Sequence, residues 1–224
     1  MRKIFLGLVA MIILIGQTAL ASPSPQWVKN LPAARTAEQM VVVAAVQGTT
    51  AWISMHEKID GQWEMIMTTP GFIGKNGLGK VKEGDNKTPV GKFRFDYAFG
   101  IAPDPGCAIS YVQVNENHYW SGEWNYKYNQ FVDVREAPAN FDKGNSEHLI
   151  DYNPHYIYGL NMGYNSSCVP GKGSALFMHC FDPAKPWTGG CVSLPEEKML
   201  FVMQHVRPGC VCVINSLKNL GGTL

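Results

Sequence analysis

One cysteine and one histidine lie in a sequence context where they could act as a catalytic pair. Cys191 follows two glycines, and His179 lies twelve positions before it, at the end of the apolar run 175–178. A cysteine attacks as a thiolate, and its free pKa of about 8.5 leaves only a small thiolate fraction at neutral pH. A histidine can remove that proton as a general base. The short loop 181–188 permits contact between the two side chains, so we interpret them as a nucleophile and its base.

The segment around Cys191 is also suited to stabilising negative charge. Gly189 and Gly190 permit backbone conformations that are closed to other residues, and a glycine-rich turn can aim N–H groups at a developing oxyanion. Apolar residues at helical spacing predict a helix over Glu196–Val206, with Pro195 and two glutamates at its start. The positive end of that helix would lie a few residues after Cys191, where it favours a thiolate.

Two other interpretations of these residues stay open. A cysteine or histidine near a strand is commonly a core residue with no chemical role. A zinc site is the second alternative, with ligands drawn from His179, Cys180, Cys191, Cys210 and Cys212. Against zinc, the chain has no cysteine pair at the usual spacing of zinc motifs, and the adjacent His179 and Cys180 would face opposite sides of a strand. We therefore expect neither a metal nor an organic cofactor.

Strand-like segments surround this pair. β-branched and alternating patterns predict strands at 40–46, 52–57, 63–69, 92–95, 156–164, 174–180 and 210–214. Asp60-Gly61 is a hairpin-turn signal between two of them. The aromatic, irregular residues 101–151 are predicted to form an insertion that covers one end of a sheet and could act as a lid. Strands outnumber helices, which predicts a mainly β fold with one firm helix after Cys191.

The amino terminus has the features of a secretory signal peptide. A short basic start, Met1–Lys3, precedes an apolar run and the small residues Ala19 and Ala21, which predicts cleavage after Ala21. An uncleaved anchor is the alternative, because the charge-free run is just long enough to span a bilayer. We expect an exported protein with no membrane segment beyond the signal peptide. Without Arg2 and Lys3, 17 of the 19 basic residues remain against 18 acidic ones, a net charge of −1 that indicates no nucleic-acid partner.

The six cysteines of an exported chain invite a disulfide prediction. Cys107 and Cys168 both lie in loop-like segments, and we expect them to pair. Cys210 and Cys212 would share one face of a strand, where neighbours rarely bridge. Free cysteines that act as small apolar core residues are the alternative.

Several segments resemble one known family. Thr188–Val192 resembles the Ser/Thr-x-Gly-Cys-apolar signature of the L,D-transpeptidase catalytic domain (YkuD or ErfK type), and His179 stands at the place of that family's upstream histidine. Residues 71–77 resemble its glycine-rich loop. Residues 82–93 resemble its Gly-Asp-x-x-Thr-Pro-x-Gly-x-Phe segment, and residues 173–179 its strand into the histidine. These segments occur in the family's order and cover most of residues 39–215.

The resemblance implies a domain organisation. The β-rich catalytic domain, a sandwich or barrel, would occupy residues 39–216 and contain the insertion 101–151. A signal peptide at 1–21 and a linker at 22–38 would precede the domain, and a tail at 217–224 would follow it.

The resemblance also implies roles for individual residues. Cys191 would be the acylated nucleophile and His179 the residue that deprotonates it. The backbone carbonyl of Cys180 would orient the imidazole, and the N–H groups of Gly190 and Cys191 would bind the oxyanion. Expected substrate contacts are Thr188, Gly189 and Tyr158. The chain departs from the family pattern at Gly189, where many members have histidine, and at Ser193, where many have arginine or asparagine.

The implied activity is acyl transfer on peptidoglycan stem peptides in the periplasm or the extracellular cell wall. Cys191 would attack the carbonyl at the L-centre of a diamino acid and release D-alanine, and an amine of a second stem would then form a 3→3 crosslink. Carbapenems would inhibit such an enzyme. Three alternatives remain: an L,D-carboxypeptidase that uses water as acceptor, a cell-wall-binding module without catalysis, and a zinc-stabilised structural domain.

Overall fold

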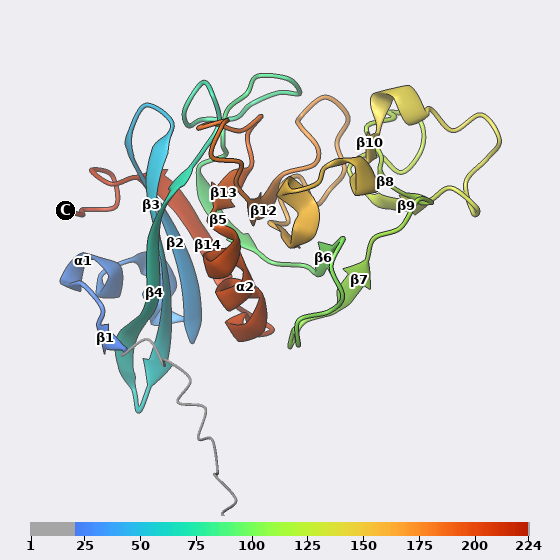
Figure 1. Cartoon of the computed structure of the whole chain (residues 1–224). Coiled ribbons are helices and arrows are strands. Elements are labelled where there is room, and N and C mark those ends of the chain that lie inside the picture. The colour runs from blue at the N-terminus through green and yellow to red at the C-terminus, as the bar shows by residue number, and fades with distance from the viewer. Residues whose placement is uncertain (1–20, 224) are drawn as a thin grey trace, which may run out of the picture.

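The structure, a computed structural model, describes residues 21–223 (Figure 1). The predicted signal peptide lies outside the described residues, apart from Ala21. Within residues 21–223, none of the helices has both the length and the apolar character needed to cross a membrane. The export prediction therefore rests on the sequence alone.

One long sheet of eleven strands forms the body of the protein. Its strands lie in the order β5-β14-β2-β3-β4-β13-β12-β11-β6-β7, and β1 pairs with β4 beside this path. In chain order they are β1 (Ser22–Pro23), β2 (Gln39–Gln47), β3 (Thr50–Ile59), β4 (Gln62–Phe72), β5 (Gly91–Arg94), β6 (Ala98–Gly100), β7 (Tyr111–Gln113), β11 (Gly159–Asn161), β12 (Phe177–Cys180), β13 (Val192–Leu194) and β14 (Val211–Ser216). A second sheet, in the order β10-β8-β9, consists of β8 (His118–Trp120), β9 (Phe131–Asp133) and β10 (Glu147–His148).

Helices are few and mostly short. The α-helices are α1 (Gln26–Lys29) and α2 (Glu196–His205), and four single 3₁₀ turns are η1 (Pro32–Arg35), η2 (Lys143–Asn145), η3 (Leu149–Asp151) and η4 (His155–Ile157). The prediction of a mainly β fold with one firm helix after Cys191 is confirmed.

The hairpins β2–β3–β4 follow directly from the sequence. In β2, Val41 and Val43 face the core that α2 covers, while Met40 and Val42 face a second core on the opposite side of the sheet. Both faces are thus apolar, as the uninterrupted hydrophobic run requires. Asp60-Gly61 forms the tight turn between β3 and β4 with φ of 51° and 78°. Two successive left-handed residues match the right-handed twist of a hairpin, which is why this dipeptide predicted the turn.

Helix α2 holds the main core together. It lies against one face of the long sheet (Figure 1), where Met199, Val202 and Met203 are fully buried among side chains from β2, β12 and β13. Pro195 precedes the helix, and Glu196 and Glu197 occupy its first turn beside the positive helix end. The helix thereby covers one face of β12 and β13, the strands that carry the candidate site on their opposite face.

The predicted insertion, residues 101–151, contains the edge strand β7 of the long sheet and the whole small sheet, which lies away from the hairpins β2–β4 (Figure 1). It is anchored by packing: Trp120 and Leu149 are buried in one cluster with Phe177 of β12 and with Cys191. The insertion therefore reaches the outer face of the strands next to the cysteine. Movement of this segment as a lid stays a prediction.

The segment 22–38 is not a linker. Ser22 and Pro23 pair with β4, and Val28 and Leu31 are buried against Met40 and Val42 of β2. The tail at 217–224 joins the same cluster through Leu217 and Leu220. Both segments pack because the outer face of β2 is apolar and would otherwise be exposed to water.

Two other local predictions were wrong. All six cysteines are free, so Cys107 and Cys168 form no disulfide. Cys107 packs against the main core, whereas Cys168 stays in a loop turn where its Sγ lies near the carbonyl of Ser166. The predicted strand 156–164 is limited to β11, because η4 turns the chain immediately before it.

Candidate active site

The parallel pair β12–β13 places Cys191 and His179 on the same face of the sheet. Met178 pairs with Val192 and His179 with Ser193. Partners in a parallel pair point to the same side, and successive residues alternate. Met178 and Val192 point into the main core beneath α2, so His179 and Ser193 point to the other face. Cys191, one residue before Val192, also points there, and its Sγ accepts a hydrogen bond from the N–H of Phe177 at 3.3 Å.

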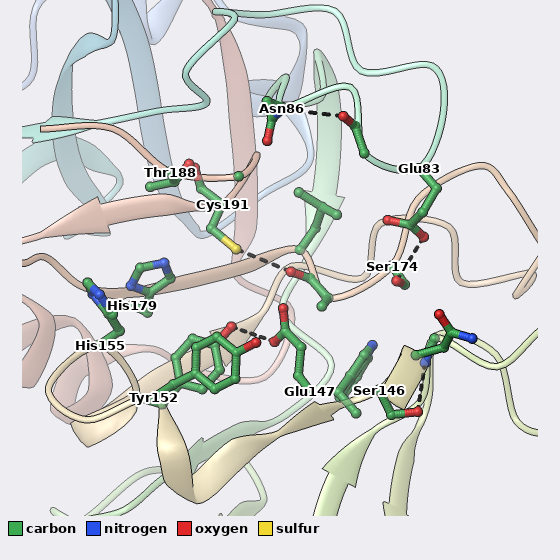
Figure 2. A pocket seen from close by; sticks show the side chains of 18 of the residues that line it. Glu83, Asn86, Ser146, Glu147, Tyr152, His155, Ser174, His179, Thr188 and Cys191 are labelled. Carbon is green, nitrogen blue, oxygen red and sulfur yellow. Dashed lines mark hydrogen bonds between the residues drawn. The ribbon is translucent and has the colours of Figure 1, made fainter. Parts of the chain in front are cut away.

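The thiol of Cys191 is buried and neutral. Its Sγ donates to the carbonyl of Ala175 at 3.2 Å, and Figure 2 shows the sulfur directed along this hydrogen bond, on the side away from His179. Burial raises the pKa of Cys191 to about 12, and the nearby carboxylate of Glu147 acts in the same direction. The resting site therefore holds a thiol and no thiolate at neutral pH.

His179 is oriented by one backbone contact. Its Nδ1 lies 2.7 Å from the carbonyl oxygen of Cys180, which is the contact that the family resemblance implied. A carbonyl can only accept, so Nδ1 carries the proton and the lone pair of Nε2 is left to act as a base. Burial lowers the pKa of His179 to about 4, against the opposing effect of the Cys180 carbonyl. The imidazole is thus neutral at physiological pH.

A hydrogen-bonded turn places Cys191 at the start of β13. The hydroxyl of Thr188 donates to the carbonyl of Cys191 at 2.7 Å and accepts the N–H of Gly190 at 3.0 Å. Thr88 donates to the carbonyl of Gly190 at 2.8 Å and accepts the N–H of Gly74 at 2.8 Å. Gly190 has a φ of +138°, a conformation that other residues rarely adopt. The Thr-Pro motif and the cysteine motif, far apart in sequence, form one buried unit.

This turn corrects one of the expected roles. The N–H of Gly190 is engaged by Thr188, so it is not free to bind an oxyanion. Thr188 is buried and its hydroxyl closes the turn, but it also lines the cavity, so its substrate contact stays a prediction. Gly189 is exposed on the cavity wall, where a substrate contact stays a prediction.

Tyr158 does not reach the site. Gly159 pairs with His179, so by alternation Tyr158 and Leu160 face the side that α2 covers. Tyr158 packs there against the main core and is not among the residues that line the cavity. Its predicted role as a substrate contact is contradicted, because the register of β11 with β12 turns its side chain to the face that α2 covers.

Cys191 and His179 open into a cavity of about 950 Å³ between the insertion and the outer face of β12 and β13. Figure 2 shows side chains that converge on it from the loop 83–86, from the insertion and η4, and from the segments around β12 and β13. Lining residues that the sequence did not reveal are Glu83, Asn86, Trp120, Glu147, Tyr152, His155 and Tyr156. The edges of the Tyr156 and His155 rings lie against the imidazole of His179, with ring centres 5.5 Å and 5.6 Å away.

The Gly-Asp motif forms a buried ion pair beside the cavity. Asp85 accepts Lys80 Nζ at 2.9 Å, and both side chains are almost fully buried. Asp85 also accepts the N–H groups of Val81, Lys82 and Lys87. Burial alone would raise the pKa of Asp85, but these hydrogen bonds outweigh it and hold the pKa well below its usual range. The motif therefore shapes the loop that leads to Thr88.

The residues proposed as zinc ligands do not converge. His179 and Cys191 face the cavity, whereas Cys180, Cys210 and Cys212 belong to the main core on the other face of the sheet. Within residues 21–223, no three histidine, cysteine, aspartate or glutamate side chains are grouped closely enough to hold a metal ion.

Comparison with known proteins decides the family. The model of the YkuD family, the L,D-transpeptidase catalytic domain, matches residues 41–214. The chain belongs to this family. Its resemblance to the YkuD signature in sequence is thereby confirmed, and the cysteine, the histidine and the Thr-Pro loop all lie within the matched region. No curated protein matches the chain significantly.

Two solved structures show a partial likeness to this chain. Bd1075 from Bdellovibrio bacteriovorus has 12% sequence identity and a TM-score of 0.42, over 82% of this chain and 50% of that one. A mutant of the helical cell shape determining protein Pgp2 from Campylobacter jejuni has 15% identity and a TM-score of 0.41, over 80% of this chain and 48% of that one. The chain spans about half the length of each.

We predict that the hydroxyl of Thr88 stabilises the cysteine turn of this YkuD domain. Thr88→Val removes it and leaves the N–H of Gly74 and the carbonyl of Gly190 without this partner, which should lower the free energy of unfolding by about 2 kcal/mol. Denaturant titration measures the loss. Thr88→Ser keeps the hydroxyl and is the matched control. Equal stability of the two variants would contradict this role.

The raised pKa of Cys191 predicts slow alkylation. Its thiol stays protonated up to a pKa of about 12, so iodoacetamide should label Cys191 more slowly than free cysteine at neutral pH. The rate should also keep rising with pH beyond the point where free cysteine levels off. Mass spectrometry of the peptide that contains Cys191 measures the rate. A plateau near neutral pH would instead indicate a preformed thiolate–imidazolium pair.

Proposed function

We propose that the protein is an exported cysteine acyltransferase that acts on peptidoglycan stem peptides as an L,D-transpeptidase. The observation that carries this proposal is the position of Cys191 and His179 on one buried face of β12–β13, at the wall of a cavity. Membership of the YkuD family supports the reaction class. Export to the periplasm or the extracellular cell wall is part of the proposal and rests on the signal-peptide features of residues 1–21.

Acylation begins from a neutral pair. Rotation about the Cα–Cβ bond of Cys191 turns Sγ from the carbonyl of Ala175 toward the cavity, and Nε2 of His179 accepts its proton as sulfur attacks the carbonyl carbon. The negative charge that develops on the carbonyl oxygen is stabilised by the N–H of Cys191, since the N–H of Gly190 is used by Thr188. D-Alanine leaves as the amine, protonated by His179.

The second half of the reaction resolves the thioester. An amine of a neighbouring stem attacks the acyl carbon, the C–S bond breaks, and the thiol of Cys191 is regenerated as the 3→3 crosslink forms. Thiol, imidazole and backbone N–H groups suffice for this chemistry, so the proposal needs no cofactor. Carbapenems are expected to inhibit by acylating the same sulfur.

We predict that Cys191→Ala and His179→Ala both abolish product formation from a defined disaccharide tetrapeptide. Loss of the nucleophile should leave no acyl-enzyme, and loss of the base should slow acylation by about 10²–10⁴-fold. Mass spectrometry of the products measures crosslinked dimers, released D-alanine and tripeptide. Matched controls are Cys168→Ala and His205→Ala, both outside the cavity.

The products also separate the two possible acceptors. Crosslinked dimers from the unmodified protein support transfer, whereas tripeptide alone supports an L,D-carboxypeptidase that uses water. If the unmodified protein and the Cys191→Ala variant both leave the substrate unchanged, the enzymatic proposal is wrong.

A further inference from the structure

Glu147 is a carboxylate in the cavity that acylation of Cys191 does not use. It belongs to β10 of the insertion and pairs with Trp120 of β8, which in turn packs edge-on against Phe177 of β12 with ring centres 4.8 Å apart. The backbone of Glu147 is thus fixed relative to the strand that carries His179. Its carboxylate lies at the cavity wall, near Cys191 (Figure 2).

Within residues 21–223, the carboxylate of Glu147 has no cationic side chain as an ion-pair partner. The hydroxyl of Tyr156 donates to Oε2 at 2.7 Å, and this is its one side-chain hydrogen bond within residues 21–223. No lysine, arginine or histidine of that range forms an ion pair with it. An enclosed carboxylate at a cavity wall without a countercharge is costly unless a ligand supplies a positive charge or a proton.

Burial raises the pKa of Glu147 to about 7, against the hydrogen bond from Tyr156, which lowers it. The ionisable groups that face it are Tyr156, Tyr152, Cys191 and the more distant Glu83. None of these groups is a cation: the charge of Glu83 favours the protonated carboxyl, whereas the hydrogen bond from Tyr156 favours the carboxylate. Near neutral pH, Glu147 can therefore both lose and accept a proton.

We propose that Glu147 is the base that removes a proton from the ammonium group of the acceptor before this amine attacks the thioester on Cys191. The inference rests on the proposed function and assigns a residue to its second half. An alkyl ammonium has a pKa of about 10.4, so nearly every acceptor enters the site protonated and without a lone pair for attack. A carboxylate at the cavity wall attracts that cation and is placed to take its proton.

The protons balance over the step. The acceptor ammonium gives one proton to the carboxylate of Glu147 and becomes the amine. The amine nitrogen attacks the acyl carbon, and its second proton passes through Nε2 of His179 to the departing sulfur of Cys191. The amide bond forms, the C–S bond breaks, and the protonated Glu147 then releases its proton to water.

Electrostatics favour this order of events. A carboxylate at position 147 opposes a thiolate at position 191, as the raised pKa of Cys191 indicates. During acceptor attack, however, Cys191 is a neutral thioester. By the time the sulfur departs, Glu147 already holds a proton, so the two groups are never both negative.

The test compares two acceptors on the full chain. Glu147→Gln removes the base but keeps the shape of the side chain. With a lysine-type alkyl ammonium acceptor at saturation, this variant should lose about 10²-fold or more of the kcat for crosslink formation. With hydroxylamine, a weakly basic amine that is already neutral near pH 7, it should retain the rate. The acylation burst, read as the carbapenem adduct on Cys191, should not become slower, because the variant also removes the charge that opposes a thiolate.

Glu116→Gln is the matched control, because it makes the same change in the same insertion at an exposed position outside the cavity. Equal loss with both acceptors, or a higher KM at unchanged kcat, would overturn the role of Glu147 as a base. Failure of the unmodified protein to form any acyl-enzyme would instead overturn the proposed function, and this inference with it.

A second variant keeps the inference testable if Glu147→Gln fails to fold. Tyr156→Phe removes the hydrogen bond that lowers the pKa of Glu147, so this pKa should rise. The acid limb of the alkyl ammonium reaction should then move to higher pH, while the hydroxylamine reaction shows no such shift. An acid limb at the same pH in Tyr156→Phe and the unmodified protein would overturn the inference.

Discussion

The parallel pairing of β12 with β13 is the constraint on which the rest of the site depends. Its register puts His179 opposite Ser193 and leaves Cys191 one step earlier on the same face. A shift of one residue in either strand would turn one of the two side chains into the core beneath α2. The apolar residues Met178, Val192 and Leu194 oppose such a shift, because they fill that core without exposure to water.

Burial then sets the chemistry of the pair. The same enclosure raises the pKa of Cys191 and lowers the pKa of His179, so the resting state is uncharged. A site of this kind transfers its proton when the substrate arrives and stores no thiolate beforehand. Because a buried thiolate is energetically costly, the sulfur stays protonated and reacts slowly with other electrophiles. The backbone carbonyl of Cys180 orients the imidazole of His179 without adding a charge.

The insertion supplies part of the cavity wall and three of its seven charged side chains, Glu123, Asp142 and Glu147. Glu147 and Trp120 reach the site from the small sheet. Tyr156 links that sheet to His179, because its hydroxyl donates to Glu147 and its ring lies against the imidazole. Cys191 and His179 both follow this segment in the chain, and the range that the family model matches includes them and the segment.

Sequence patterns within a few residues predicted the elements whose structure depends on interactions between near neighbours in the chain. The β2–β4 hairpins, the Asp60-Gly61 turn and α2 each carry their pattern within a few residues, and the alternation before His179 fixed its face. Contacts between distant segments were not predictable in this way. Three features depend on tertiary contacts that no spacing in the sequence reveals. They are the hydrogen bond from the Gly190 N–H to Thr188, the packing of residues 22–38 on β2 and the position of Glu147 at the cavity wall.

Nuclear magnetic resonance of the imidazole nitrogens of His179, followed through a pH titration, tests the neutral pair most directly. We predict a neutral ring with its proton on Nδ1 from pH 8 down to the region of its pKa of about 4, with nearly the same titration in Cys191→Ala. An imidazolium signal at neutral pH that disappears in Cys191→Ala would show a resting thiolate–imidazolium pair and contradict this picture of the site.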